Sequence, residues 1–258
     1  MKFIIASILT IASAHGATLI YEHNFLGIGS APLDGAEVET SSGTLGGTAG
    51  ATWTAGTLWE ADGTTTKTAS SQHSAYVPFS PQDGYIYRIS ATVSIDSIGT
   101  GDYWVAMSLL DGAPETSTAF HNLNTTYATI GRRASGYGGN NLLRWPGPKT
   151  SGGAHLNNTT PDAWRLSIVL DTTVSGSWSY RLMMEGGTDT EVISNSYSLP
   201  SNSIDYIMFS NFQDVSASVD NFVVTAEIPE PTLPAMASLL LAAMLPLRRS
   251  RRAPGVIG

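Results

Sequence analysis

The feature that most constrains this chain is a strict alternation of apolar and polar side chains. From Tyr85 to Ile95 a large or small apolar residue occupies every second position, and from Arg88 onward the positions between them are polar. A period of two puts one kind of side chain on each face of an extended segment, which is typical of a half-buried antiparallel strand. The same alternation recurs over Tyr103–Leu109, Trp164–Leu170 and Trp178–Met184. The middle of the chain shows no convincing helical period, so we expect an all-β fold.

Further segments have strand-like composition and end at Gly, Asp, Asn, Ser or Pro. They are Thr18–Phe25, Ala51–Trp59, Tyr127–Arg132, Val192–Tyr197, Ile204–Asn211 and Val219–Thr225. About ten strands with turn signals throughout predict one antiparallel two-sheet sandwich, a jelly roll, over residues 17–227. The segment Ser135–Asn158 is rich in Gly and Asn, and we expect it to be a long surface loop at the rim.

The charge of the chain is unevenly distributed. Eight basic and all twenty-one acidic residues lie between Lys2 and Arg248, which gives this part a net charge of 8 − 21 = −13. Such a charge repels phosphate backbones and anionic lipid surfaces, so nucleic acid is not an expected partner. The chain has no cysteine, which excludes disulfides and cysteine-ligated zinc.

The N-terminus has the layout of a secretory signal peptide. Lys2 precedes an apolar run from Phe3 to Ala12, and small residues follow it. The pattern predicts a signal peptide over residues 1–16, removed by signal peptidase after Ala14 or, as we favour, Gly16. The alternative is a core helix or strand at the true N-terminus.

The C-terminus combines a short motif, an apolar run and a basic cluster. Pro229, Glu230 and Pro231 are followed by an uncharged run, Leu233–Leu247, and then by Arg248, Arg249, Arg251 and Arg252. As a single hydrophobic helix this run rises about 22 Å, which is short of the roughly 30 Å hydrocarbon core of a bilayer. The arginines favour the cytoplasmic side and form a basic stop, which leaves the Pro-Glu-Pro motif outside.

This order of parts, residues 228–258, resembles the PEP-CTERM sorting signal. The resemblance implies recognition of Pro229, Glu230 and Pro231 by a membrane enzyme called exosortase, cleavage near the motif, and transient or permanent membrane contact through the helix. It also implies an exported protein of the cell envelope, outer surface or extracellular matrix of a Gram-negative-type bacterium that makes exopolysaccharide. Pro234, Pro246 and the extension Ala253–Gly258 depart from the usual pattern. An ordinary C-terminal membrane anchor is the alternative.

The strand pattern also resembles concanavalin-A-like, laminin-G-like sandwiches. The residues that carry this likeness are Tyr85–Ile95, Tyr103–Leu110, Ala163–Asp171 and Val219–Val224. The resemblance implies carbohydrate binding or adhesion and, in some branches, glycan cleavage.

The sequence contains no recognisable catalytic constellation. Glycan-cleaving sandwiches that resemble laminarinases carry Glu-x-Asp-x-Glu on one strand, and that triplet does not occur in this chain. The pairs Glu37/Glu39 and Asp189/Glu191 read as solvated carboxylates at turns or strand edges. The histidines lack a metal-ligand spacing, and no Gly-x-Ser-x-Gly elbow is present. We therefore expect a non-catalytic protein without a cofactor. A calcium ion stays open as an alternative, with Asp96, Asp102, Asp111 and Asp220 nearest to expected strand ends.

Aromatic residues are the remaining sign of a ligand site, because Tyr and Trp offer flat apolar faces with a polar edge. Trp164 and Trp178 are in phase with core residues, whereas Trp104 has the opposite parity to Tyr103 and Val105. The candidate ligand-binding residues are Tyr137 and Trp145, with Arg132, Arg133 and Arg144 nearby, together with Trp104. We expect a surface or matrix protein that contacts exopolysaccharide. The alternatives are a secreted glycan-active enzyme and a structural envelope protein without a small ligand.

Overall fold

A computed structural model of the chain describes one compact unit, Gly16–Ile228. The described residues are 16–27, 31–65, 72–95, 104–119, 125–133, 142–145, 154–156, 163–186, 189–192, 197–199, 203–212 and 216–229. Residues 1–15 of the expected signal peptide (1–16) and residues 230–258 of the expected sorting signal (228–258) lie outside them. Within the described ranges, no helix is long and apolar enough to cross a membrane.

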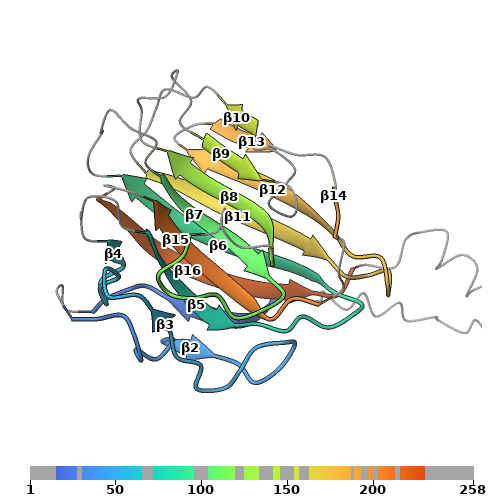
Figure 1. Ribbon diagram of the computed structural model, residues 1–258. Helices are drawn as coiled ribbons and strands as arrows, with labels where there is room; N and C mark the ends of the chain where they lie inside the picture. The colour runs from blue at the N-terminus through green and yellow to red at the C-terminus, as the bar shows by residue number, and fades with distance from the viewer. Residues whose placement is uncertain are drawn as a thin grey trace, which may run out of the picture. The chain divides into compact units, whose positions relative to one another are not determined.

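Among the described residues, nine antiparallel strands form the first sheet (Figure 1). Its main path runs β13-β12-β11-β6-β16-β1-β2, with β14 paired to β12 and β4 paired to β16. The strands are β1 (Thr18–His23), β2 (Thr40–Ser41), β4 (Thr64–Thr65), β6 (Ile86–Ile95), β11 (Ala163–Asp171), β12 (Ser179–Gly186), β13 (Asp189–Val192), β14 (Tyr197–Ser198) and β16 (Ala217–Glu227).

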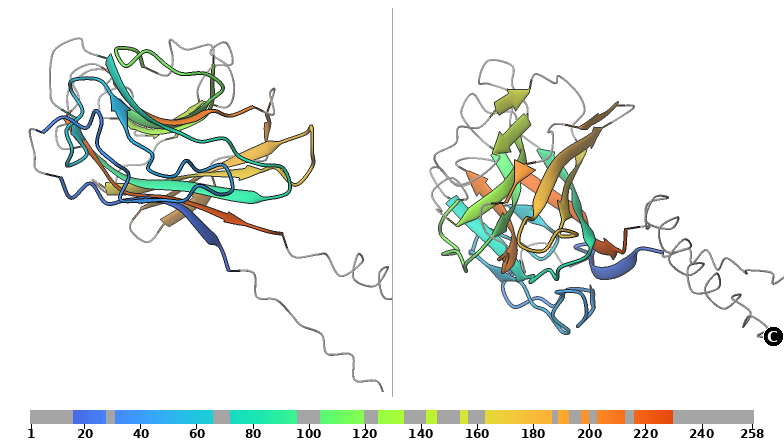
Figure 2. Two further views of the ribbon diagram at one scale, coloured as in Figure 1. Left: turned by 90° about the horizontal axis from the view of Figure 1, so that it is seen from below. Right: turned by 90° about the vertical axis from the view of Figure 1, so that its right-hand side faces the viewer.

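The second sheet has seven antiparallel strands in the order β10-β9-β8-β7-β15-β5-β3. The strands are β3 (Thr54–Ala55), β5 (Gln72–Pro78), β7 (Trp104–Leu110), β8 (Thr126–Arg133), β9 (Leu142–Trp145), β10 (Ala154–Leu156) and β15 (Tyr206–Phe212). Figure 2 shows the two sheets as stacked layers. The prediction of an all-β, two-sheet antiparallel fold is therefore confirmed.

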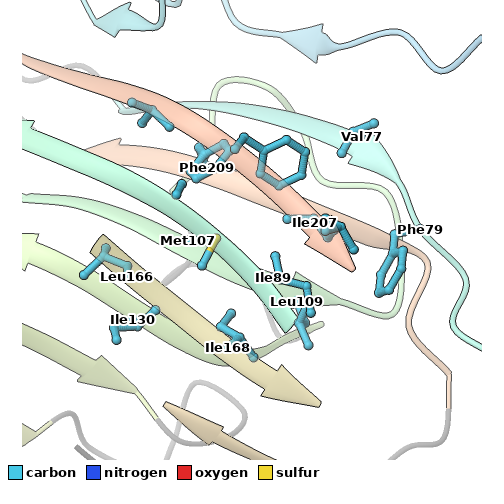
Figure 3. Packing of buried hydrophobic residues seen from close by; sticks show 14 of the residues in the cluster. Val77, Phe79, Ile89, Met107, Leu109, Ile130, Leu166, Ile168, Ile207 and Phe209 are labelled. Atoms are coloured by element: carbon cyan, nitrogen blue, oxygen red, sulfur yellow. The ribbon is translucent and has the colours of Figure 1, made fainter. Parts of the chain in front are cut away.

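The core lies between the two sheets and is formed by the residues that alternate inward. Ile89, Leu166 and Ile168 of the first sheet lie across from Met107, Leu109, Ile130, Ile207 and Phe209 of the second, and all are at most 1% exposed (Figure 3). Full burial of one such side chain stabilises the fold by about 1.5–3 kcal/mol. The period of two from Tyr87 to Val93 thus marks the core-facing side of β6.

The N-terminal part of the unit closes this core with aromatic rings. Trp53 lies 5.4 Å from Phe222 and 5.9 Å from Phe209, centroid to centroid, so it contacts strands of both sheets. Tyr21 of β1 donates from its hydroxyl to the Pro78 carbonyl at the end of β5, over 2.6 Å. Burial raises the pKa of Tyr21, and hydrogen bonding with Thr48 opposes the rise.

Two local predictions were wrong. The expected loop Ser135–Asn158 contains β9 and β10, which extend the sheet from β8. Ala51–Trp59 was predicted to be one strand, but only Thr54–Ala55 pairs as a strand, with an isolated bridge at Thr52. Of the expected strand Val192–Tyr197, only the two end residues are described, and they lie in β13 and β14. Short strands at sheet edges lack a long alternation because their stability comes from pairing with a neighbour.

Candidate functional site

The outer face of the second sheet is apolar, which is unusual for a sheet face that points away from the core. On β7, Val105, Met107 and Leu109 enter the core between the sheets, so the residues that alternate with them point outward. The outward residues Trp104, Ala106 and Leu110 form a second cluster with Ala119 and Met208. Tyr76, Tyr206 and Phe212 pack against this cluster, and we call the whole set the aromatic outer face. A solvated sheet face normally carries polar side chains.

Two aromatic pairs lie on this face. Trp104 and Phe212 are stacked, with centroids 5.3 Å apart and planes 12° apart. Tyr76 and Tyr206 meet edge to face at 5.2 Å and 83°. Trp104 is only 4% exposed, whereas Phe212 and the two tyrosines are half-buried. Part of each tyrosine therefore stays accessible to solvent.

A row of small side chains separates the two aromatic pairs. Ser74, Ser210, Ala106 and Gly131 are cross-strand neighbours on β5, β15, β7 and β8. At Gly131 a Cβ atom would lie 2.6 Å from the Val105 carbonyl oxygen, so the backbones approach too closely for any other residue. Beside this row, the hydroxyls of Ser108 and Thr129 share a buried hydrogen bond of 2.8 Å.

The segment Asp111–Ala119, called the cover segment below, packs on part of this row. The Ser74 amide donates to the Thr116 carbonyl over 2.8 Å, and the Ser74 hydroxyl donates to the Thr118 carbonyl. Ala119 is fully buried against the aromatic outer face. In Figure 2 the green segment that follows β7 arches over the side of the second sheet that faces away from the first.

A carboxylate and a phenol anchor the start of the cover segment. Tyr127 donates from its hydroxyl to Asp111 Oδ2 over 2.9 Å. Burial, the hydrogen bond to Asp111 and the charge of that carboxylate raise the pKa of Tyr127 to about 12. The tyrosine therefore stays protonated and keeps donating over the whole physiological pH range.

The sequence-predicted ligand residues fall in different places. Trp104 lies on the aromatic outer face, but its ring is covered. Trp145 lies on β9 with its backbone opposite Thr129, and Tyr137 lies outside the described residues. Arg132 does not belong to a surface patch: it is 9% exposed, and its guanidinium carbon lies 5.8 Å from the ring centroid of Trp164.

Asp111 and Asp220, two of the acids considered for calcium, accept hydrogen bonds within the fold. Asp111 accepts from Tyr127, as described above. Asp220 Oδ1 accepts from the Asn221 amide over 2.7 Å, at a bulge of β16 where Asn221 has φ of 50°. Asp96 and Asp102 lie outside the described residues. In the described part of the chain, no three His, Asp or Glu side chains are grouped as a metal site would need.

Comparison with known proteins finds likenesses among solved structures only. No family model and no curated protein sequence matches the chain. The metal-free carbohydrate recognition domain of Emp46p is 12% identical, with a TM-score of 0.43, covering 69% of this chain and 89% of that one. The exoplasmic/lumenal domain of VIP36, bound to Ca²⁺ and Man3GlcNAc, is 9% identical, with a TM-score of 0.45, covering 70% and 87%. An uncharacterized protein from Mycobacterium paratuberculosis is 10% identical, with a TM-score of 0.46, covering 79% and 99%. Such likenesses concern the fold alone.

Proposed function

We propose that this chain is an exported, non-catalytic protein that binds exopolysaccharide at the cell surface or in the extracellular matrix. The observation that carries the proposal is the aromatic outer face, where half-buried Tyr76, Tyr206 and Phe212 pack around a buried cluster that contains Trp104. Packing of the cover segment accounts for the buried residues of this face, but Tyr76 and Tyr206 stay partly exposed where a solvated sheet normally carries polar side chains.

The chemistry of this face suits a neutral sugar. A pyranose ring has an apolar face of C–H groups and a polar edge of hydroxyls, and a tyrosine offers a matching flat ring with a hydroxyl. The edge-to-face contact of Tyr76 and Tyr206 fixes both rings before a ligand arrives, which lowers the entropy lost on binding. The cover segment borders the same face with exposed Glu115 and Ser117 as polar groups.

The ring of Tyr206 provides the direct test. We expect Tyr206→Ala to weaken binding to a neutral polysaccharide on a glycan array by about tenfold, which is a loss of roughly 1.4 kcal/mol. Tyr85→Ala is the matched control, because Tyr85 is also half-buried but precedes β6 on the first sheet. Equal binding by the two variants would contradict the proposed site. Release of product from the polysaccharide would instead favour a glycan-active enzyme.

The route of export has a separate test. In a bacterium that carries exosortase, replacement of Pro229, Glu230 and Pro231 by Ala should leave an unprocessed chain in the membrane fraction. Unchanged processing and location would indicate an ordinary C-terminal anchor, and an intact Met1 on the exported protein would exclude a cleaved signal peptide.

A further inference from the structure

Three arginines gather on the outer face of the first sheet. Arg88 of β6, Val169 of β11 and Arg181 of β12 are cross-strand neighbours in one row, and Arg165 lies on β11 four residues from Val169. All three arginines are exposed. With strands about 4.8 Å apart and a rise of about 3.4 Å per residue, they mark a triangle of about 10 by 14 Å. We call this set the arginine face.

Two of the guanidinium groups converge on the row between them. That row consists of Ser90, Ser167 and Met183, side by side on β6, β11 and β12. Arg165 Nη2 donates to Ser90 Oγ over 3.0 Å, and Arg88 Nη1 lies 3.9 Å from Met183 Sδ. Both arginines therefore extend toward the same middle row, from its two sides.

A hydroxyl without a partner lies in this middle row. Ser167 is 1% exposed, and its Oγ forms no hydrogen bond with any residue that the structure describes. A buried hydroxyl without a partner costs free energy. Ser167 lies below the surface, so the exposed guanidinium groups of Arg88 and Arg165 are the donors that an anion can reach.

The charges around the arginine face leave it cationic in an acidic protein. Three of the eight basic residues between Lys2 and Arg248 lie here, in a stretch with twenty-one acidic ones. Within the described residues, the hydrogen bonds of Arg88 and Arg165 are to neutral atoms. Glu185 is the cross-strand neighbour of Arg165, and Asp171 lies beside Arg181, so these two carboxylates offset part of this charge. A hollow of about 120 Å³ beside Arg181 is lined by Val169, Asp171 and Ser179, among others.

We propose that the arginine face binds the carboxylate groups of an acidic polysaccharide, at a site separate from the aromatic outer face. Guanidinium groups pair with carboxylates through two parallel hydrogen bonds, which fits the exposed, fork-shaped donors of Arg88 and Arg165. A thin polymer strand meets only this local patch. An extended anionic membrane would also meet the acidic surface around it and be repelled.

The test uses polygalacturonate as the probe and its fully methyl-esterified form as the uncharged control. We expect the purified protein to bind polygalacturonate, to release it as NaCl is raised, and to ignore the ester. Replacement of Arg88, Arg165 and Arg181 by Gln should weaken this binding by at least about tenfold while the melting temperature stays near that of the parent.

A charge-matched variant separates a local site from general attraction. Thr40→Glu, Thr52→Glu and Thr57→Glu together change the net charge by −3, as the triple Arg→Gln variant does, at exposed positions away from β6, β11 and β12. This variant should bind polygalacturonate as the parent does. An equal loss in both variants would overturn the proposal, as would an unchanged triple Arg→Gln variant. Arginine-dependent binding to phosphatidylglycerol vesicles with no binding to the polymer would assign the face to membranes instead.

The two proposed sites can be tested independently of each other. The triple Arg→Gln variant should keep its binding to a neutral polysaccharide, and Tyr206→Ala should keep its binding to polygalacturonate. Loss of both ligands in either variant would indicate general unfolding and count against a separate arginine face.

Discussion

The two outer faces of this sandwich have opposite chemistry although both sheets are antiparallel. The first sheet presents arginines, hydroxyls and carboxylates on β6, β11 and β12, as a solvated face should. The second presents Trp104, Met208 and Phe212, and the cover segment packs on them. A sheet that needs only one core can leave its other face to solvent. The second sheet carries a second apolar cluster, and such a cluster needs a cover or a ligand.

The largest expected effect compares two methionines that both point away from the inter-sheet core. Met208 of β15 is fully buried on the aromatic outer face, whereas Met183 of β12 is half-buried on the arginine face. Met208→Ala should reduce the free energy of unfolding by about 2–5 kcal/mol because it leaves a cavity, and Met183→Ala by less than about 1 kcal/mol. Urea denaturation measures both, and equal losses would show that the two faces are buried alike.

A smaller effect compares two buried serines on the same faces. Ser74 donates to the cover segment at Thr118, and Ser90 accepts from exposed Arg165. Ser74→Ala should cost about 1–2 kcal/mol because the Thr118 carbonyl loses its donor, whereas Ser90→Ala should cost less than about 0.5 kcal/mol. Faster proteolytic cleavage of the cover segment in the Ser74 variant alone would support this assignment; cleavage at the parent rate would contradict it.

The buried imidazole of His23, which lies on neither outer face, makes the stability of the fold depend on pH. Burial lowers the pKa of His23, with a smaller opposing effect of the Glu39 charge, and His23 Nδ1 accepts from the Glu39 amide over 3.2 Å. The unfolded chain takes up the proton near pH 6.5, so this stability is complete above that pH and is lost as the pH falls through the folded pKa. His23→Gln should flatten the fall in melting temperature below pH 6.5. Burial lowers the pKa of His73 too, so a residual slope should vanish in the double variant.

Asp83 titrates in a separate and more acidic window. Ser175 and Trp178 donate to its two oxygens, and these hydrogen bonds lower the pKa of the carboxyl group. The stability it contributes is therefore present above its ordinary pKa near 3.9 and is lost below it. Asp83→Asn should lower the melting temperature by a constant amount above about pH 4 and flatten its fall only below that pH; a change of slope near pH 6 would contradict this assignment.

The residues that form the fold were predictable from the sequence, but the pairing of the strands was not. Alternation in β6 identifies its core-facing side, because a period of two assigns each side chain to one face. The sequence does not reveal that β6 lies between β11 and β16, because these pairings join residues that are far apart in the sequence. Arg88, Arg165 and Arg181 each have a parity that places them outside the core, yet only the sheet order brings them together.

The aromatic outer face is visible in the sequence as continuous apolar runs and not as an alternation with a period of two. Trp104–Leu110 and Tyr206–Phe212 are nearly continuous apolar runs, so both faces of these strands carry apolar residues. Such runs are typical of strands covered on both sides. The parity of Trp104 indicated an outward side chain, but what covers it depends on the cover segment, whose Gly, Pro and Thr residues predict only a turn.

The smallest expected effect tests whether the arginine face, unlike the aromatic outer face, is accessible to a charged ligand. Glu185 lies opposite Arg165 and competes with any incoming carboxylate. Glu185→Gln should therefore tighten polygalacturonate binding by about twofold to threefold, as removal of one exposed opposite charge allows. Glu37→Gln makes the same change in net charge at an exposed position of the N-terminal segment and should leave the affinity unchanged. A carboxylate bound next to Arg165 responds to the neighbouring Glu185 far more than to a distant, screened charge, so only Glu185→Gln should tighten binding. Equal tightening in both variants would mean that the polymer responds to the net charge of the protein.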